Sequence, residues 1–254
     1  PPPPPPPRIE CRRQRQMCIR DRSDLGRLNA YDGATLQAIG DAGAELDDDP
    51  GLRAGVITGA GGEFCSGADV AAVAAGGFDD PPYPEVAEGI SAKPLVAAIE
   101  GRCLGGGMMI ACGADLRLAG RGASFGLPEG RWNYPAQWLG ALGRQVLPAH
   151  AMELALLADG RLPAQRLAEM GWLNRVVADG SALSEALAWA DRLAALAPRA
   201  LRNFKELVRA AAWSDPDTAL AMGHRHAAEQ VSMADTAEGA AAFAESRPPR
   251  FEDR

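Results

Sequence analysis

The sequence predicts an α/β fold, in which short buried strands alternate with helices. Apolar runs at residues 53–58, 95–100 and 115–119 have the length and composition of buried strands. Segments between and after them carry apolar residues at helical spacing, and turns rich in glycine join the strands to the helices. This alternation, with its short connections, favours one compact α/β unit followed by a helical region.

The first helix is expected over residues 32–47. Leu36, Ile39, Ala42 and Leu46 recur at the spacing of one helix face. Asp32 is a candidate N-cap, and the segment at 48–51 contains the proline and glycine that end a helix.

The later helices and strand are predicted from the same signals, apolar spacing and residues that end a helix. A helix over residues 85–92 should stop before Pro94, and another should run from the triple glycine at 105–107 to Gly113. From residue 149 onward the pattern is helical except for a strand at 174–177. Two helix faces are expected there, formed by Leu183, Leu187, Ala190 and Leu193, and then by Leu201, Phe204 and Val208.

The first 22 residues differ from the rest of the chain. Seven prolines lead into an arginine-rich stretch without helical or strand periodicity and without the apolar core of a signal peptide. We therefore divide the chain into a non-native or disordered leader at 1–22, a core at 23–180 and a helical C-terminal region at 181–254.

Composition narrows the functional classes. The net charge of −7 provides no basic field for nucleic acid, and no apolar run approaches the roughly 20 residues that span a membrane. The five cysteines show no CxxC spacing, which predicts reduced thiols and a cytoplasmic protein. The three histidines lie far from any cysteine cluster, so no metal site is expected.

Three segments contain small residues or glycine, which allow the backbone to come close to another segment or to a ligand. These are the turn at 64–69, the triple glycine at 105–107 and the dipeptide Pro128-Glu129. The first two segments follow predicted strands, so each should present free N–H groups at a helix start. Two such turns facing each other would form a pair of donors for a developing oxyanion.

These segments, in this order, resemble the crotonase (enoyl-CoA hydratase/isomerase) superfamily, and the resemblance runs from about Leu28 to Arg254. It implies a crotonase-like ββα spiral core with a C-terminal helical trimerisation region, and hence a homotrimer or hexamer. It also implies an acyl-CoA thioester substrate and no separate cofactor, because coenzyme A is part of the substrate. Members usually place one or two strands before Leu28, so the first sheet is expected to be incomplete here.

The resemblance assigns site residues individually. The N–H groups of Ala68 and Gly106 would stabilise the oxyanion, and Glu129 would transfer protons. Family hydratases carry a second glutamate where this chain has Met109, one turn beyond Gly106. Because a double-bond shift needs only one proton-transfer group, this arrangement resembles the isomerase branch.

Further residues are predicted to bind the substrate. Coenzyme A would run past the 28–30 segment and Ser66 to the thioester, and the full predicted substrate-binding set comprises Arg27, Leu28, Ala30, Ser66, Gly67, Asp69, Met109 and Trp132. Asp69 is expected to hold the turn rather than to act as an acid. Trp132 either packs beneath the C-terminal helices or narrows the acyl pocket.

Other functions stay open or are disfavoured. The alternatives are a hydratase with an atypical site, a non-catalytic CoA-thioester-binding homologue, and hydrolysis or decarboxylation of an acyl-CoA. A nicotinamide-dependent oxidoreductase is disfavoured, because the glycine pattern at 59–62 fails at Phe64.

Overall fold

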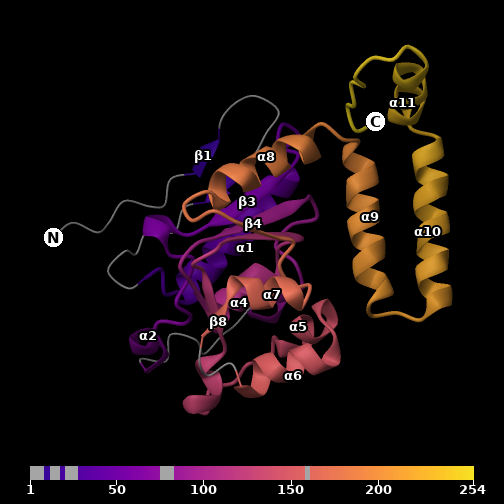
Figure 1. Cartoon of the computed structure of the whole chain (residues 1–254). Helices are drawn as coiled ribbons and strands as arrows, with labels where there is room; N and C mark the ends of the chain where they lie inside the picture. Colours follow the sequence, from indigo (N-terminus) through magenta and orange to yellow (C-terminus); the bar gives the residue numbers. More distant parts are fainter. Residues whose placement is uncertain (1–8, 12–17, 21–27, 75–82, 158–160) are drawn as a thin grey trace.

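The computed structural model describes the chain except for residues 1–8, 12–17, 21–27, 75–82 and 158–160 (Figure 1). Its main sheet has six strands in the order β1-β2-β3-β4-β6-β9. Every neighbouring pair is parallel except the first, which is antiparallel. The strands are β1 (Ile9–Cys11), β2 (Cys18–Arg20), β3 (Gly55–Thr58), β4 (Leu95–Ile99), β6 (Leu116–Gly120) and β9 (Arg175–Val177).

The two faces of this sheet contact different helices. Leu95, Ala97 and Ile99 of β4 point into a large cluster that includes residues of α1 (Gly33–Asp48) and α4 (Gly106–Cys112). Val96 and Ala98, which alternate with them, pack beneath α8 (Ala182–Ala194). This alternation of side chains places helices on both faces, as a parallel sheet requires.

Alanines rather than leucines form the centre of the α8 contact. Ala182, Ala186 and Ala190 are buried against β3, β4 and β6, while the leucines expected to face inward are only partly buried. Small side chains let the helix axis approach the sheet closely, so the inward stripe is displaced from the predicted one. Because α8 packs on the sheet, it is part of the core layers, although the division predicted at residue 181 grouped it with the terminal helices.

A smaller sheet supports the turns of interest. It consists of β5 (Arg102–Leu104), β7 (Ser124–Gly126) and β8 (Leu162–Pro163), with β5 parallel to β7 and β7 antiparallel to β8. The sequence did not predict β5 or β8 as strands, because two- and three-residue segments are too short to show periodicity.

The remaining helices surround this framework. They are α2 (Val70–Ala74), α3 (Tyr83–Glu88), α5 (Leu139–Gln145), α6 (Pro148–Leu157) and α7 (Ala164–Glu169), with 3-10 turns η2 (Ala60–Gly62) and η3 (Pro128–Arg131). The first predicted helix is confirmed as α1, and Asp32 caps it by accepting a hydrogen bond of 2.8 Å from the Thr35 N–H. The helix predicted at 85–92 is shorter than expected and ends at Glu88.

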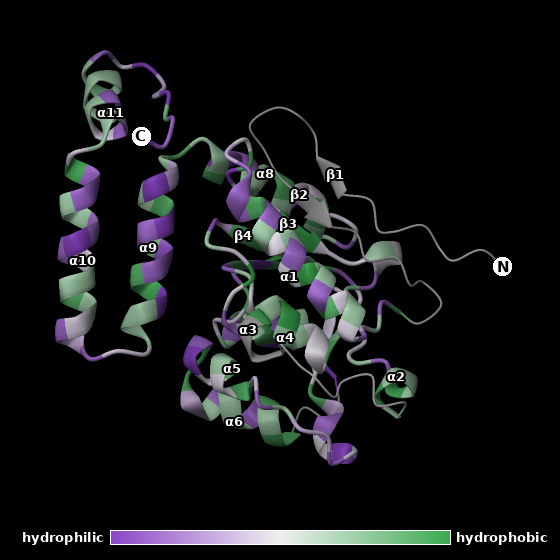
Figure 2. Ribbon diagram, turned by 180° about the vertical axis from the view of Figure 1, so that it is seen from behind, coloured by the Kyte–Doolittle hydropathy of each residue, from purple (hydrophilic) through white to green (hydrophobic). Residues whose placement is uncertain are grey.

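A helical hairpin projects from the core. Helices α9 (Pro198–Ala211) and α10 (Pro216–Val231) lie side by side, and α11 (Ala234–Ala244) follows near the C-terminus (Figure 1). Both long helices carry hydrophilic and hydrophobic residues along their length (Figure 2). No helix in the described part of the chain is long and apolar enough to cross a bilayer.

Two strands, β1 and β2, fall within residues 1–22, a segment whose sequence shows no strand periodicity. β2 pairs in parallel with β3, matching Ile19 with Val56, and β1 pairs with β2. Hydrogen bonding to the edge of β3 can hold such short segments although their sequences show no alternation. The sheet therefore continues past β3 and is not cut short at that edge. The rest of 1–22 lies outside the described residues, and whether the leader is native stays a prediction.

Candidate active site

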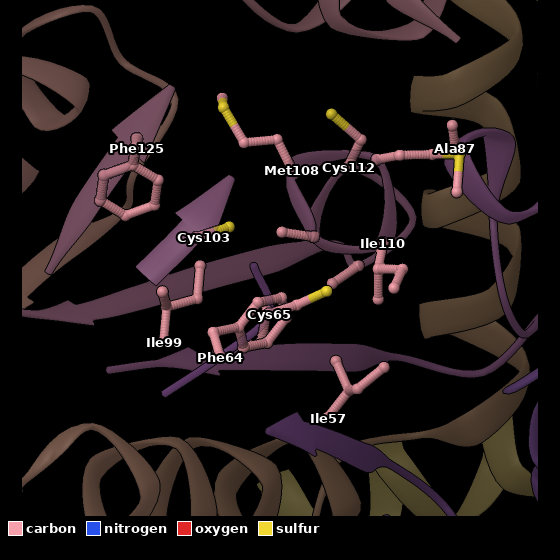
Figure 3. Packing of buried hydrophobic residues seen from close by; sticks show 14 of the residues in the cluster. Ile57, Phe64, Cys65, Ala87, Ile99, Cys103, Met108, Ile110, Cys112 and Phe125 are labelled. Atoms are coloured by element: carbon pink, nitrogen blue, oxygen red, sulfur yellow. The ribbon is translucent and has the colours of Figure 1, made fainter. Parts of the chain in front are cut away.

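The two predicted turns lie against each other. The Cys65 N–H donates to the Arg102 carbonyl at 2.8 Å, and the Leu104 N–H donates back to the Cys65 carbonyl at 3.0 Å. Cys65 and Cys103 are thus neighbours at the base of the turns, within the buried cluster shown in Figure 3. Each turn continues three residues further, to Ala68 in one and to Gly106 in the other.

Glycine allows the turns to approach at their tips. Gly67 has φ 104°, a conformation that side chains rarely adopt. A Cβ atom at Gly67 would lie 3.2 Å from the Leu104 carbonyl oxygen and 3.9 Å from the Gly106 nitrogen. The residues predicted to supply the oxyanion donors are therefore brought together.

The N–H groups of Ala68 and Gly106 are available. Gly106 is the first residue of α4, where an N–H has no acceptor within the helix. Among the hydrogen bonds of the described residues, neither N–H serves as a donor. Two N–H groups with no acceptor, on adjoining turns, suit a carbonyl oxygen that gains negative charge.

The absence of a Cβ at each residue of the triple glycine lets a different part of the chain pack closely there. A Cβ at Gly105 would lie 2.6 Å from Oε1 of Glu129, and one at Gly107 would lie 2.6 Å from the carbonyl oxygen of Cys65. A Cβ at Gly106 would collide with the ring and hydroxyl of Tyr31. The three glycines thus let the candidate acid–base residue, the N-terminal segment and the opposite turn converge on one helix start.

The carboxylate of Glu129 is half-buried beside Gly105, and its Oε2 is buried without a hydrogen-bond partner among the residues that the structure describes. Burial raises the pKa of Glu129 above its ordinary value. The backbone around it is tightly turned, because its carbonyl accepts the N–H groups of Trp132 at 3.0 Å and Tyr134 at 3.1 Å. A fixed carboxyl group with a raised pKa suits proton transfer.

Met109 occupies the position of the second family glutamate and is buried, with 2% of its surface exposed. It belongs to the large apolar cluster in the first turns of α4. A thioether cannot exchange a proton, so this position provides only an apolar wall.

The segment at 28–31 is fixed against the first turn. Leu28 and Asn29 both have positive φ, 54° and 56°. The Leu28 carbonyl accepts the Ser66 N–H at 3.1 Å, and the Asn29 side chain donates to the Ala60 carbonyl at 2.9 Å. The structure therefore holds the segment that contains Leu28 and Ala30 against Ser66 and Gly67, and the binding of substrate there stays a prediction.

Sequence reasoning missed Asn29 and Tyr31 as organising residues. Asn29 is almost fully buried and also donates to the Glu63 carbonyl at 2.6 Å. Asparagine tolerates the left-handed conformation better than most residues, and that preference was the available signal. Nothing local in the sequence indicates that the Tyr31 ring reaches Gly106.

Other predicted site residues have different surroundings. The Asp69 carboxylate accepts the Ala71 N–H at 2.9 Å, which agrees with a role in holding the turn. Trp132 is 78% exposed, so packing beneath the C-terminal helices is wrong for this chain, and narrowing of the acyl pocket stays a prediction. Arg27 lies outside the described residues.

The described residues contain no group of three or more side chains suited to hold a metal ion.

Known proteins are similar to this chain over nearly its whole length. The sequence model of the Enoyl-CoA hydratase/isomerase family matches residues 20–254. Enoyl-CoA hydratase EchA19 of Mycobacterium tuberculosis is 34% identical over 238 residues, which is 89% of each chain. Carnitinyl-CoA dehydratase of Proteus mirabilis is 32% identical over 250 residues, covering 91% of this chain and 93% of its own.

Solved structures agree with the sequence relatives. The crystal structure of an enoyl-CoA hydratase from Mycobacterium tuberculosis H37Rv superposes with a TM-score of 0.87 at 34% identity, covering 98% of this chain and 99% of that one. An enoyl-CoA hydratase from Polaromonas sp. JS666 gives a TM-score of 0.85 at 29% identity, covering 96% and 99%. Because the family model, these relatives and these structures all match nearly the whole chain, the chain belongs to the enoyl-CoA hydratase/isomerase family of the crotonase superfamily.

Proposed function

We propose that this family member shifts the double bond of an enoyl-CoA, using Glu129 as its single proton-transfer residue. The observation that carries the proposal is the Glu129 carboxylate, which lies against the start of α4 and whose buried Oε2 has no partner in the described part of the chain. A buried group without a partner costs stability, and such groups are retained where a ligand supplies the missing interaction.

The oxyanion donors perform the first part of the chemistry. Removing a proton next to a thioester carbonyl places negative charge on the carbonyl oxygen, and the N–H groups of Ala68 and Gly106 can both donate hydrogen bonds to that oxygen. One preorganised donor of this kind contributes roughly 3 to 4 kcal/mol to transition-state stabilisation.

Glu129 performs the second part. As a carboxylate it would take a proton from one carbon of the enoyl chain, and as a carboxylic acid it would return the proton two carbons away. Its raised pKa brings these two forms closer in free energy near neutral pH. The apolar Met109 wall excludes a second carboxylate from the position where hydratases use one.

Hydration or dehydration is the second candidate, and the names of the relatives favour it. EchA19 is named an enoyl-CoA hydratase, and the Proteus protein is named a carnitinyl-CoA dehydratase. Such a reaction in this chain would have to proceed with Glu129 and without a second carboxylate at position 109.

Coenzyme A would approach along the 28–30 segment and Ser66. The chain has two lysines, Lys93 and Lys205, and both ammonium groups are engaged by backbone carbonyls within the protein. Arginines would therefore have to bind the phosphates, and Arg27 directly precedes the 28–30 segment in the sequence.

The unpaired thiols of Cys65, Cys103 and Cys112 fit a reducing compartment such as the cytoplasm.

We propose a homotrimer or hexamer because the helical hairpin exposes large apolar side chains. Phe204 and Val208 of α9 are 59% and 73% exposed, and Leu220 of α10 is 61% exposed. A cavity of about 450 Å³ lies between α9 and the core, and Phe204, Val208 and Trp213 line part of it. Contacts with further copies would bury such surfaces.

The test is an activity panel with 2-enoyl-, 3-enoyl-, malonyl- and 3-hydroxyacyl-CoA, run on the wild type and on Glu129→Gln. We expect turnover of the 3-enoyl substrate and a loss of about 10²- to 10⁴-fold in kcat for the variant. Glutamine keeps the size of the side chain, so binding of the CoA thioester should change little. Full activity of Glu129→Gln on every substrate of the panel would falsify the assignment. Turnover of only the 2-enoyl and 3-hydroxyacyl substrates would establish the second candidate.

A further inference from the structure

Tyr31 contacts both of the turns that carry the candidate oxyanion donors. It is buried, with 6% of its surface exposed, and it belongs to the large apolar cluster. Its backbone engages one turn and its ring engages the other.

The backbone of Tyr31 brackets Ala68. The Tyr31 N–H donates to the Gly67 carbonyl at 2.9 Å, and its carbonyl accepts the Asp69 N–H at 2.7 Å. These two bonds hold the residues on either side of Ala68, which forms an isolated parallel bridge with Tyr31. The direction of the Ala68 N–H is therefore fixed relative to the Tyr31 backbone.

The ring of Tyr31 contacts Gly106. The Tyr31 hydroxyl, Cε1 and Cζ occupy the space that a Cβ at Gly106 would need. The ring edge is thus in van der Waals contact with the residue that supplies the other N–H. An aromatic side chain has only two rotatable bonds, so a ring held in this cluster is a stiff spacer.

We propose that Tyr31 is a positioning residue, whose ring sets the separation of the Ala68 and Gly106 N–H groups. This inference rests on the proposed function, because it concerns the same pair of donors. An oxyanion donor is effective only when it lies about 2.7–3.1 Å from the oxygen that gains charge, so a shift of a few tenths of an ångström between the turns weakens one of the two bonds. Tyr31 need not touch the substrate for this effect.

The experiment measures the oxyanion site without turnover. A 3-oxoacyl-CoA is titrated with pH in the presence of excess enzyme, and its enolate is followed by near-ultraviolet absorbance. Donors for an oxyanion lower the apparent pKa of the bound ligand relative to the free ligand. Steady-state kcat and KM are measured on the substrate that the wild type turns over.

Three variants separate positioning from general destabilisation. Tyr31→Phe keeps the ring, Tyr31→Leu removes the spacer, and Leu118→Ala is a core truncation in the other cluster, beneath α8. We expect Tyr31→Leu to raise the apparent pKa of the bound ligand by about one unit and to lower kcat about tenfold, with little change in KM. Leu118→Ala should behave as the wild type in both measurements, and Tyr31→Phe, which keeps the ring but not the hydroxyl, should shift both by less than Tyr31→Leu does.

Each result decides a different question. If the wild type leaves the enolisation of the ligand unshifted, the oxyanion site itself is wrong and the proposed function fails. If the wild type shifts it and Tyr31→Leu shifts it equally, the positioning role of Tyr31 is overturned. Should Tyr31→Leu fold poorly, Gly106→Ala pushes on the ring from the other side and must also raise the apparent pKa of the bound ligand, or the inference is wrong.

Discussion

The two ends of helix α4 have opposite chemical surroundings. At its N-terminal end, the Gly106 N–H has no acceptor among the described residues, and the adjacent Glu129 keeps one buried oxygen unpartnered. At its C-terminal end, Arg209 donates to the Gly113 carbonyl at 3.3 Å and Arg117 donates to the Ala111 carbonyl at 3.3 Å. One end is left open and the other is closed by cations, which also suit the negative end of the helix dipole.

The closed end is organised around Asp115. Its carboxylate accepts Lys205 Nζ at 2.7 Å, Arg209 Nη2 at 2.8 Å and the Leu95 N–H at 2.8 Å. Lys205 also donates to the carbonyls of Ser91 and Lys93, both at 2.7 Å. This network joins α9 to the start of β4.

We interpret this difference as a division between polar groups that stabilise the fold and polar groups proposed to act on the substrate. Charged groups that stabilise a structure find their partners within the chain, whereas groups kept unpartnered in a partly buried place await a ligand. On this comparison, removing the carboxylate at the closed end should lower stability without altering the chemical step, whereas removing the carboxylate at the open end should impair the chemical step without lowering stability.

The largest stability effect is expected at the closed end. Asp115→Ala leaves the Lys205 ammonium and the Arg209 guanidinium without their carboxylate, and breaking a largely buried ion pair costs about 3 kcal/mol of unfolding free energy. Chemical denaturation measures the loss, and kcat per folded enzyme should remain near wild type. Asp41→Ala, at an exposed position on α1, is the matched control and should change stability by less than about 0.5 kcal/mol. If Asp115→Ala had the same denaturation midpoint as the wild type, the Asp115 network would not stabilise the fold, and the proposed difference between the two ends of α4 would be wrong.

Much of the open end could be predicted from the sequence, because close backbone approach restricts residue type. The turn at 64–69, the triple glycine and Pro128-Glu129 are visible as residues, and the structure brings them together as expected. The strand–helix alternation likewise predicted β3, β4 and β6.

The rest depends on tertiary contacts that have no local pattern. The packing of the Tyr31 ring on Gly106 joins segments that are distant along the chain, and the inward alanines of α8 are recognisable only once the sheet beneath them is known. The Asp115 network has the same character, since its lysine and arginine are supplied by a different helix.

An intermediate effect is expected from making the open end more polar. Met109→Glu restores a carboxylate one turn beyond Gly106, where a second group could activate water. We expect hydration of a 2-enoyl-CoA to rise by about tenfold, which corresponds to about 1.4 kcal/mol in the barrier. Met109→Gln is the control, because it is polar but cannot accept the proton, and it should give no increase. An equal rise for both variants would show that polarity, and not proton transfer, limits hydration.

The smallest effect has the opposite sign to that of Asp115→Ala. Burial raises the pKa of Glu129 in the folded protein, so the folded state holds the proton more tightly than the unfolded state does. Above the folded-state pKa the ionised, partly buried carboxylate therefore destabilises the wild type, and this penalty is lost as the pH falls through that pKa toward the unfolded value of about 4.3. Glu129→Gln should consequently be more stable than the wild type at neutral pH, by on the order of 1 kcal/mol, and the difference should vanish in acid.

Thermal unfolding of both proteins at several pH values measures this difference. Glu229→Gln, at an exposed position on α10, is the control and should follow the wild type at every pH. If Glu129→Gln were less stable than the wild type at neutral pH, the carboxylate would have a stabilising partner in the unliganded protein. The open end of α4 would then resemble the closed end, and the site would not be held ready for a ligand.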